Sequence, residues 1–349
     1  MAIKKLGITE FLLQSGGFPI FDVRSPGEFN HAHMPGVNSL PLFNDEERKI
    51  VGTAYKQQGK QKAIKLGLDF FGVKMRAMVE AVEATLKTFE GPKEKIFVHC
   101  WRGGMRSAGV AWMLDLYGYD VYTLVGGYKA YRNHVLATFE KHYDIRILGG
   151  YTGSGKTLLL EQLKKQGESM IDLEALAKHK GSAFGALGQP AQPTPEMFEN
   201  MLAVELEKNT QNTFWLEDES QRIGILNIPH AFWKNMRTKP VFFVDIPFEE
   251  RLDYICQEYG RHPKDSMISS ILRIQKRLGP LETKTAIGLL VEDNVKECFR
   301  ILLAYYDKTY QKSLENRENI SSLLNKISCS GVDTVSNTEK LLACVSSFA

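Results

Sequence analysis

The chain has 349 residues, of which 43% are hydrophobic and 24% are charged. Disordered, collagen-like and small disulfide-stapled proteins have different compositions, so these classes are excluded. The 44 lysines and arginines exceed the 41 acidic residues by only three, a balance that neither indicates nor excludes binding to nucleic acid. At roughly 100 to 200 residues per domain, this length predicts two domains.

The cysteines and the N-terminal segment indicate the cellular compartment in which the protein is expected. No two of the five cysteines form a C-x-x-C pair, so the sequence predicts neither a zinc site nor paired disulfides, and we assign no metal ligands. We therefore expect a reducing, cytoplasmic environment. The N-terminal segment does not resemble a signal peptide and no long apolar run occurs, so we expect no membrane association.

The first part of the chain alternates strand-like and helical patterns. Between strand-like runs, apolar residues recur at helical spacing from Met75 to Phe89, and Gly91-Pro92 ends that helix. The alternation predicts an α/β domain with a parallel sheet over residues 1–142. The runs that predict its buried strands are 20–23, 96–99 and 121–125.

A second α/β pattern begins at residue 143, and we predict one domain over residues 143–349 with a helical C-terminal part. Six of the fifteen residues from Gly181 to Pro195 are Gly or Pro, which predicts a long loop over a site. The predicted strands of this domain are 144–148, 169–172, 212–216 and 241–245.

A cysteine-containing loop, residues 100–107, lies between a predicted strand and a predicted helix. Free N–H groups and the dipole at the start of that helix favour a thiolate at Cys100. Arg102 and Arg106 add positive charge, and Gly103-Gly104 lets the loop curl so that its N–H groups point inward. The loop is therefore predicted to bind a phosphate-like oxyanion that Cys100 attacks, and this chemistry requires solvent access to the thiol. An inert buried cysteine is the alternative.

Residues 150–157, GYTGSGKT, fit the P-loop pattern G-x-x-x-x-G-K-[ST] with a predicted strand before them and a helix after them. In this motif backbone N–H groups converge on a diphosphate, the lysine adds a positive charge, and the hydroxyl can reach Mg²⁺. The motif indicates phosphate binding without distinguishing a nucleotide from another diphosphate. The predicted phosphate-binding residues are Gly150, Gly153, Ser154, Gly155, Lys156 and Thr157.

Two further clusters are weaker signals. Asp218, after a predicted strand, is a candidate for the acid that holds Mg²⁺ beside a P-loop, with Asp172 as its competitor and solvated acids as the plain alternative. Six basic and two acidic residues lie between Arg261 and Lys284. On one helical face there, Arg273, Lys276 and Arg277 either follow an RNA backbone or form an ordinary solvated surface.

The first domain resembles the rhodanese family. Its signature is matched by Asp22-Val23-Arg24, Glu28-Phe29, the run 33–36 (HMPG) and the cysteine loop, although Ala32 stands where the signature usually has glycine. The spacing Cys-x5-Arg is one residue longer than in the usual sulfurtransferase loop, and this length, with His99, also matches Cys-dependent phosphatases. A rhodanese-type phosphatase or sulfurtransferase with a nucleotide-binding domain is therefore an alternative function.

The combination of both modules resembles the selenophosphate-dependent tRNA 2-selenouridine synthases. The resemblance implies a transferase that replaces sulfur by selenium in 2-thiouridine at the wobble position of the tRNAs for Lys, Glu and Gln. It implies selenophosphate and geranyl diphosphate as substrates, no tightly bound cofactor, and Mg²⁺ as an optional ion. The additional matching runs are 44–48, 51–53, 55–59, 181–185 and 217–224.

The same resemblance suggests roles for individual residues. Cys100 would carry selenium as S-selanylcysteine, while Arg102 and Arg106 hold the phosphate end of the donor. Lys156 would bind geranyl diphosphate, whose chain is attached to the sulfur before selenium replaces it. A protein that binds RNA through its P-loop domain and carries an inactive rhodanese module is the non-enzymatic alternative.

Overall fold

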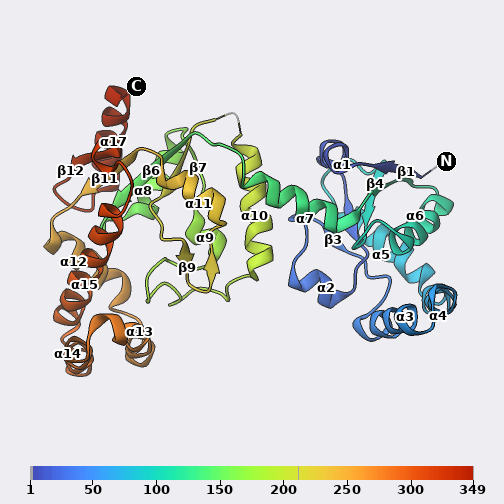
Figure 1. Ribbon diagram of the computed structural model, residues 1–349, viewed down its shortest axis with the longest axis horizontal. Coiled ribbons are helices and arrows are strands. Elements are labelled where there is room, and N and C mark those ends of the chain that lie inside the picture. The colour runs from blue at the N-terminus through green and yellow to red at the C-terminus, as the bar shows by residue number, and fades with distance from the viewer. Residues whose placement is uncertain (1–2, 211, 349) are drawn as a thin grey trace. The chain divides into compact units, whose positions relative to one another are not determined.

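The computed structural model describes residues 3–210 and 212–348, and the chain divides into two compact units (Figure 1). Unit 1 comprises Met1–Thr138 with Glu199–Val204, and unit 2 comprises Phe139–Phe198 with Glu205–Ala349. Among the described residues, no helix is both long enough and apolar enough to cross a membrane.

The first unit is built on a five-stranded sheet in which all pairings are parallel. The order across the sheet is β1-β5-β4-β2-β3. Because Asp22 pairs in register with His99, the carboxyl ends of β2 and β4 lie side by side, and the cysteine loop leaves the sheet at this edge. The strands are β1 (Lys4–Leu6), β2 (Ile20–Asp22), β3 (Asn38–Ser39), β4 (Lys95–His99) and β5 (Asp120–Leu124).

Helices of unit 1 cover this sheet because their apolar residues recur at helical spacing. On α5, Met78, Val82 and Leu86 are buried against Phe21 and Val98 of the sheet. The helices are α1 (Ile8–Ser15), α2 (Pro26–His31), α3 (Asp45–Gln57), α4 (Lys60–Gly72), α5 (Met75–Thr88), α6 (Met105–Tyr117) and α7 (Gly127–Thr138).

The second unit contains another five-stranded parallel sheet and a short antiparallel hairpin. The order across the sheet is β12-β11-β6-β8-β7, so β6, which leads into the P-loop, is central. The strands are β6 (Ile145–Gly150), β7 (Ser169–Met170), β8 (Phe214–Glu217), β9 (Arg222–Ile223), β10 (Leu226–Asn227), β11 (Val241–Asp245) and β12 (Leu324–Ser328).

Two apolar clusters stabilise the second unit. One packs Leu159 and Leu163 of the helix after the P-loop against the sheet residue Trp215, and the other surrounds Phe184 with C-terminal helices. The helices are α8 (Lys156–Lys165), α9 (Leu173–Ala177), α10 (Pro195–Lys208), α11 (His230–Arg237), α12 (Phe248–Tyr259), α13 (Lys264–Leu278), α14 (Pro280–Val291), α15 (Val295–Glu315), α16 (Ile320–Leu323) and α17 (Thr334–Phe348).

The predicted fold class is confirmed, because two parallel α/β units occur in the predicted order and helices dominate the C-terminal part. The predicted loop from Gly181 contains no helix or strand until α10 begins at Pro195. One element of the C-terminal part differs from the prediction, since β12 is a strand that pairs with β11 at the sheet edge.

Candidate functional site

The cysteine loop is held against the start of α7 by close backbone contacts. Cys100 accepts a hydrogen bond from the backbone N–H of Tyr128 at 2.8 Å, and Trp101 accepts one from Lys129 at 3.0 Å. Gly103 has a φ of +62°, and a Cβ on it would lie 2.3 Å from the carbonyl oxygen of Leu124. Only glycine fits this position, because both the backbone conformation and the available space exclude a side chain.

The loop presents a set of unpaired backbone donors. Among the described residues, none of the backbone N–H groups from Trp101 to Ser107 donates a hydrogen bond to the protein. The last three of these belong to the first turn of α6, where the positive end of the helix dipole adds to their effect. These are the unpaired donors that an oxyanion cradle requires, and oxyanion binding by the loop stays a prediction.

The Cys100 thiol differs from the sequence-based expectation in its exposure. We expected solvent access, but Cys100 is only 3% exposed, and its Sγ lies 3.2 Å from the Ser107 hydroxyl. Apolar neighbours from the sheet and α6, together with the Ser107 hydroxyl, surround the sulfur, which is the burial expected of the alternative that the sequence left open. Arg102, in contrast, is exposed at the surface.

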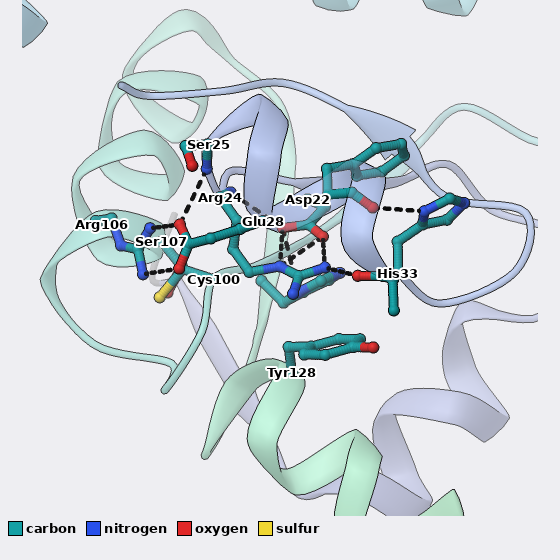
Figure 2. A network of polar contacts seen from close by, with 12 residues as sticks. Asp22, Arg24, Ser25, Glu28, His33, Cys100, Arg106, Ser107 and Tyr128 are labelled. Atoms are coloured by element: carbon teal, nitrogen blue, oxygen red, sulfur yellow. Dashed lines mark hydrogen bonds and ion pairs between the residues drawn. The ribbon is translucent and has the colours of Figure 1, made fainter. Parts of the chain in front are cut away.

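Arg106, predicted to hold phosphate, is paired with a carboxylate in this structure (Figure 2). Its Nη1 donates to Oε2 of Glu28 at 2.7 Å, and Glu28 also accepts from the backbone N–H of Ser25 at 3.1 Å. Burial acts to raise the pKa of Glu28, but the hydrogen bond and charge of Arg106 lower it to about 2. Glu28 is thus an internal anion beside the cysteine loop, and sequence reasoning did not assign it that role.

A second, buried ion pair supports the same edge of the sheet. Arg24 is 1% exposed, and its guanidinium binds the Asp22 carboxylate and lies 3.7 Å from the ring centre of Tyr128 (Figure 2). Nδ1 of His99 is 3.8 Å from Asp22 Oδ1, and neither ring nitrogen has a hydrogen-bond partner among the described residues. Burial lowers the pKa of His99, so the neutral ring is favoured.

The P-loop connects β6 to α8 in the conformation that the motif requires. Gly153 and Gly155 have φ values of +82° and +70°, which glycine adopts readily. Lys156 Nζ donates to the Gly150 carbonyl at 3.2 Å, so the ammonium folds back over the loop. Among the described residues, the backbone N–H groups of Tyr151, Thr152, Gly153, Gly155, Lys156 and Thr157 donate to no protein group.

The acids beside the P-loop are not those that the sequence suggested. Thr157 Oγ1 donates to Glu217 Oε1 at 2.9 Å and lies 3.4 Å from Glu174 Oε2. Glu174, Glu217 and Glu219 each offer an oxygen within 4.8 Å of the others. A Cβ on Gly181 would lie 2.6 Å from Glu174 Oε1, so the predicted loop does begin over this cluster.

The two predicted acids have other partners. Asp218 accepts hydrogen bonds from Tyr310 at 2.8 Å and from Arg317, while Asp172 caps α9 through the Ala175 backbone N–H. Side chains alternate across a strand, so Glu217 at the end of β8 points to the P-loop side while its neighbour Asp218 points away. Glu217, and not the candidate Asp218, therefore lies beside the Thr157 hydroxyl, and a magnesium-binding role for either residue stays a prediction.

Of the three clustered residues, Glu217 is buried and Glu174 and Glu219 are partly buried, so three carboxyl groups lie close together with little access to water. Burial raises the pKa of each, and neighbouring carboxylates raise those of Glu174 and Glu219 further. Carboxylate and hydroxyl oxygens are the donors that Mg²⁺ prefers. The donor set fits a magnesium ion, which would relieve the repulsion among the carboxylates.

A small apolar cavity of about 20 Å³ adjoins the P-loop. Its walls combine one P-loop residue with the loop after Gly181 and with helices α12 and α15. Between the lining residues Ser182 and Phe184, Ala183 donates its backbone N–H to the hydroxyl of Tyr306 at 3.1 Å. The lining residues are Thr152, Ser182, Phe184, Ile255, Tyr259, Phe299, Leu302, Leu303 and Tyr306.

The basic cluster singled out in the sequence lies on α13. Arg273, Lys276 and Arg277 are exposed, and Arg273 Nη1 donates to the Ala183 carbonyl at 3.4 Å. RNA contact through this face stays a prediction.

Comparison with known proteins assigns both units. Residues 9–134 match the family model of the rhodanese-like domain, and residues 143–326 match that of the tRNA 2-selenouridine synthase AAA domain. The tRNA 2-selenouridine synthase of Nitrosomonas europaea is 35% identical over 291 residues, which cover 80% of this chain and 73% of that protein.

Two further relatives align over more of their length. The tRNA 2-selenouridine synthase of Bdellovibrio bacteriovorus is 34% identical, and the alignment covers 86% of this chain and 89% of that protein. The corresponding values for the enzyme of a Sulfurovum species are 34%, 88% and 91%. The chain therefore belongs to the tRNA 2-selenouridine synthase family and is a transferase that modifies tRNA with selenium.

The geometry of the cysteine loop predicts different effects of two neighbouring glycine substitutions. Gly103→Ala should destabilise unit 1 by at least about 2 kcal/mol, because of the left-handed backbone and the overlap with Leu124. Gly104→Ala is the matched control, since a Cβ there meets no atom within 4 Å, and it should change stability by less than about 0.5 kcal/mol. Urea unfolding measures both, and equal effects would contradict the described loop.

Proposed function

We propose that this enzyme converts wobble 2-thiouridine to 2-selenouridine in two displacements, each served by one of the two oxyanion-binding loops. The observation that carries the proposal is that the cysteine loop and the P-loop both hold backbone N–H groups that donate to no group in the described part of the chain. One loop adds a thiol, and the other adds an ammonium group. The tRNAs for Lys, Glu and Gln carry the thiolated nucleoside in this proposal.

The first displacement attaches a geranyl group to sulfur. The sulfur at C2 of 2-thiouridine attacks C1 of geranyl diphosphate, the C1–O bond breaks, and the base loses its N3 proton. Diphosphate leaves with the electron pair, and the P-loop N–H groups with Lys156 stabilise its charge. The alkylated sulfur can later depart as a thiolate, which the original thiocarbonyl sulfur cannot do readily.

The acid cluster supports a role for Mg²⁺ in this step. Glu174, Glu217 and Glu219, with the Thr157 hydroxyl, would hold the ion beside the P-loop. A bound Mg²⁺ supplies positive charge to the leaving diphosphate. Thr157 and Glu217, which are hydrogen-bonded to each other, would hold this charge next to the backbone cradle.

The apolar cavity supports a place for the hydrocarbon chain. Thr152 belongs to the P-loop and also lines the cavity, so a diphosphate in the loop leads its chain toward Phe184 and Leu303. A ten-carbon chain needs more than the present 20 Å³, so Phe184 and its loop must move when the chain enters.

The second displacement delivers selenium. The Cys100 thiolate attacks selenium of selenophosphate, the Se–P bond breaks with its electron pair on phosphorus, and phosphite leaves. The Cys100-bound selenium then attacks C2 of the base and geranylthiolate departs. A second thiol finally cleaves the S–Se bond, forming a disulfide with Cys100 and releasing the selenouridine.

The arginines of the cysteine loop bind the donor in this proposal. In this structure the guanidinium of Arg106 is already paired with the Glu28 carboxylate. The phosphate end of selenophosphate must therefore displace that carboxylate before it can bind Arg106. That exchange opens the region beside the buried Cys100 sulfur, and Arg102 meets the donor from the surface.

Replacement of the nucleophile separates the two displacements. Cys100→Ser should abolish selenation and leave geranylation of 2-thiouridine tRNA unchanged, because the hydroxyl cannot carry selenium. Mass spectrometry of wobble nucleosides measures both products, and ³¹P NMR should detect phosphite from the unaltered enzyme. Selenation by the variant, or release of orthophosphate only, would contradict the Cys-bound intermediate.

Removal of the P-loop ammonium has the opposite effect. Lys156→Ala should slow geranyl transfer by about 100-fold, because one charged donor to the leaving diphosphate is lost. Selenation of tRNA that is already geranylated should proceed at the unaltered rate, which also verifies folding. An unchanged rate of geranyl transfer would remove the P-loop from this step.

The acid cluster can be tested by metal binding alone. Mg²⁺ at about 100 times its Kd should stabilise the protein by about 2.7 kcal/mol, measured as a rise in the unfolding temperature. Glu217→Gln should abolish the rise, whereas Glu161→Gln, at an exposed position of α8, should retain it. Absence of the rise in the unaltered protein would contradict a magnesium site.

A further inference from the structure

The helical hairpin of α3 and α4 carries a concentration of positive charge that the mechanism does not use. Between residues 48 and 68 there are six basic residues and no acidic ones, whereas the acidic residues of the two helices lie outside this stretch, at Asp45, Glu46, Glu47 and Asp69. All six are exposed. We call this surface the basic hairpin; its residues are Arg48, Lys49, Lys56, Lys60, Lys62 and Lys65.

The local structure brings most of these charges together. Gly59, with a φ of +89°, turns the chain between the two helices, which contact each other, and Ala54 and Ala63 on either side of the turn are buried. Figure 1 shows the two helices side by side. Lys56 lies in the last turn of α3, and Lys60 and Lys62 lie in the first turn of α4, so they meet at the hairpin turn.

Five of these cations have no internal counter-charge. Among the described residues, none of the five lysines of the basic hairpin forms an ion pair, whereas other basic residues of the same unit do. For example, Lys74 pairs with Glu47, and Arg76 pairs with Glu80. Like charges at one turn repel each other, so the arrangement gives no stability to the unit and is suited to an anionic partner.

The uncharged residues of the surface favour RNA as that partner. Tyr55 is 52% exposed, which leaves its ring free to stack on a base or its hydroxyl free to donate to phosphate. Gln57, Gln58 and Gln61 are also exposed at the turn and offer amide donors. The hairpin thus combines cations and amide donors suited to phosphate with an aromatic ring suited to a base.

The basic hairpin is continuous with the cysteine loop. Arg48 Nη2 lies 3.4 Å from Glu28 Oε1, and the same carboxylate binds Arg106. Asp45, at the start of α3, accepts the Gly27 backbone N–H at 2.9 Å. With about 1.5 Å per residue, α3 extends about 20 Å from this edge, a length that spans several nucleotides.

We propose that the basic hairpin binds the sugar-phosphate backbone of the tRNA substrate and positions the modified nucleoside at the Cys100 loop. The proposal uses the established action of the family on tRNA and does not depend on the geranyl route. It differs from the contact predicted on α13, because the charges here are in the unit that contains the thiol.

Combined substitution of four lysines tests the proposal. Lys56→Ala, Lys60→Ala, Lys62→Ala and Lys65→Ala together should raise the Kd for 2-thiouridine tRNA at least about tenfold near physiological salt. The slope of log K against log salt concentration should fall by about 3, since each phosphate contact contributes roughly 0.7 to 0.9. Binding is measured without geranyl diphosphate or selenophosphate, so the result is independent of the proposed reaction steps.

Matched variants separate RNA contact from general electrostatics and from misfolding. Lys87→Ala with Lys93→Ala removes exposed lysines elsewhere in the same unit and should leave affinity unchanged. Replacement of the four hairpin lysines by arginine should retain the affinity, and Lys62→Glu alone should weaken it. An unchanged Kd in the fourfold alanine variant, or an equal loss in the Lys87 and Lys93 control, would overturn the proposal.

Discussion

The structure depends on one constraint: within residues 3–210 and 212–348, backbone N–H groups without a protein partner are concentrated at the carboxyl ends of two parallel sheets. An unpaired donor shielded from water is costly, and an oxyanion satisfies several such donors at once. Both loops achieve this with glycines in left-handed conformations, Gly103 in one and Gly153 and Gly155 in the other.

In each loop the positive side chain already has a partner within the protein, and a bound substrate must displace that partner. In unit 1, Arg106 binds Glu28, and in unit 2, Lys156 binds the Gly150 carbonyl while three glutamates crowd around Thr157. The positive side chain of unit 1 is paired with a carboxylate, whereas that of unit 2 is paired with a neutral carbonyl group. The cysteine loop exchanges one anion for another, whereas the P-loop side has surplus carboxylate that a cation can neutralise.

The sequence was sufficient for features determined by local spacing, and insufficient for those determined by pairing between distant segments. Glycine spacing predicted both loops, and apolar periodicity predicted most strands and α5. The Arg106–Glu28 pair joins residues 78 positions apart, so no local pattern reveals it. The choice of Glu217 over Asp218 depends on which face of β8 meets the P-loop, although the alternation of side chains along the strand could have suggested it. Helix α3 did have a local signal, the capping box of Asn44 and Glu47.

The buried thiol of Cys100 becomes consistent with catalysis when the Glu28–Arg106 pair is considered with it. A thiol that is 3% exposed reacts slowly with general oxidants and electrophiles, which is an advantage for a residue that must carry reduced selenium. A donor without a negative group has nothing to offer Arg106 and leaves the pair in place. Selenophosphate carries both the atom to be transferred and an oxyanion that competes with Glu28, so in the proposed mechanism the substrate itself uncovers the nucleophile that attacks it.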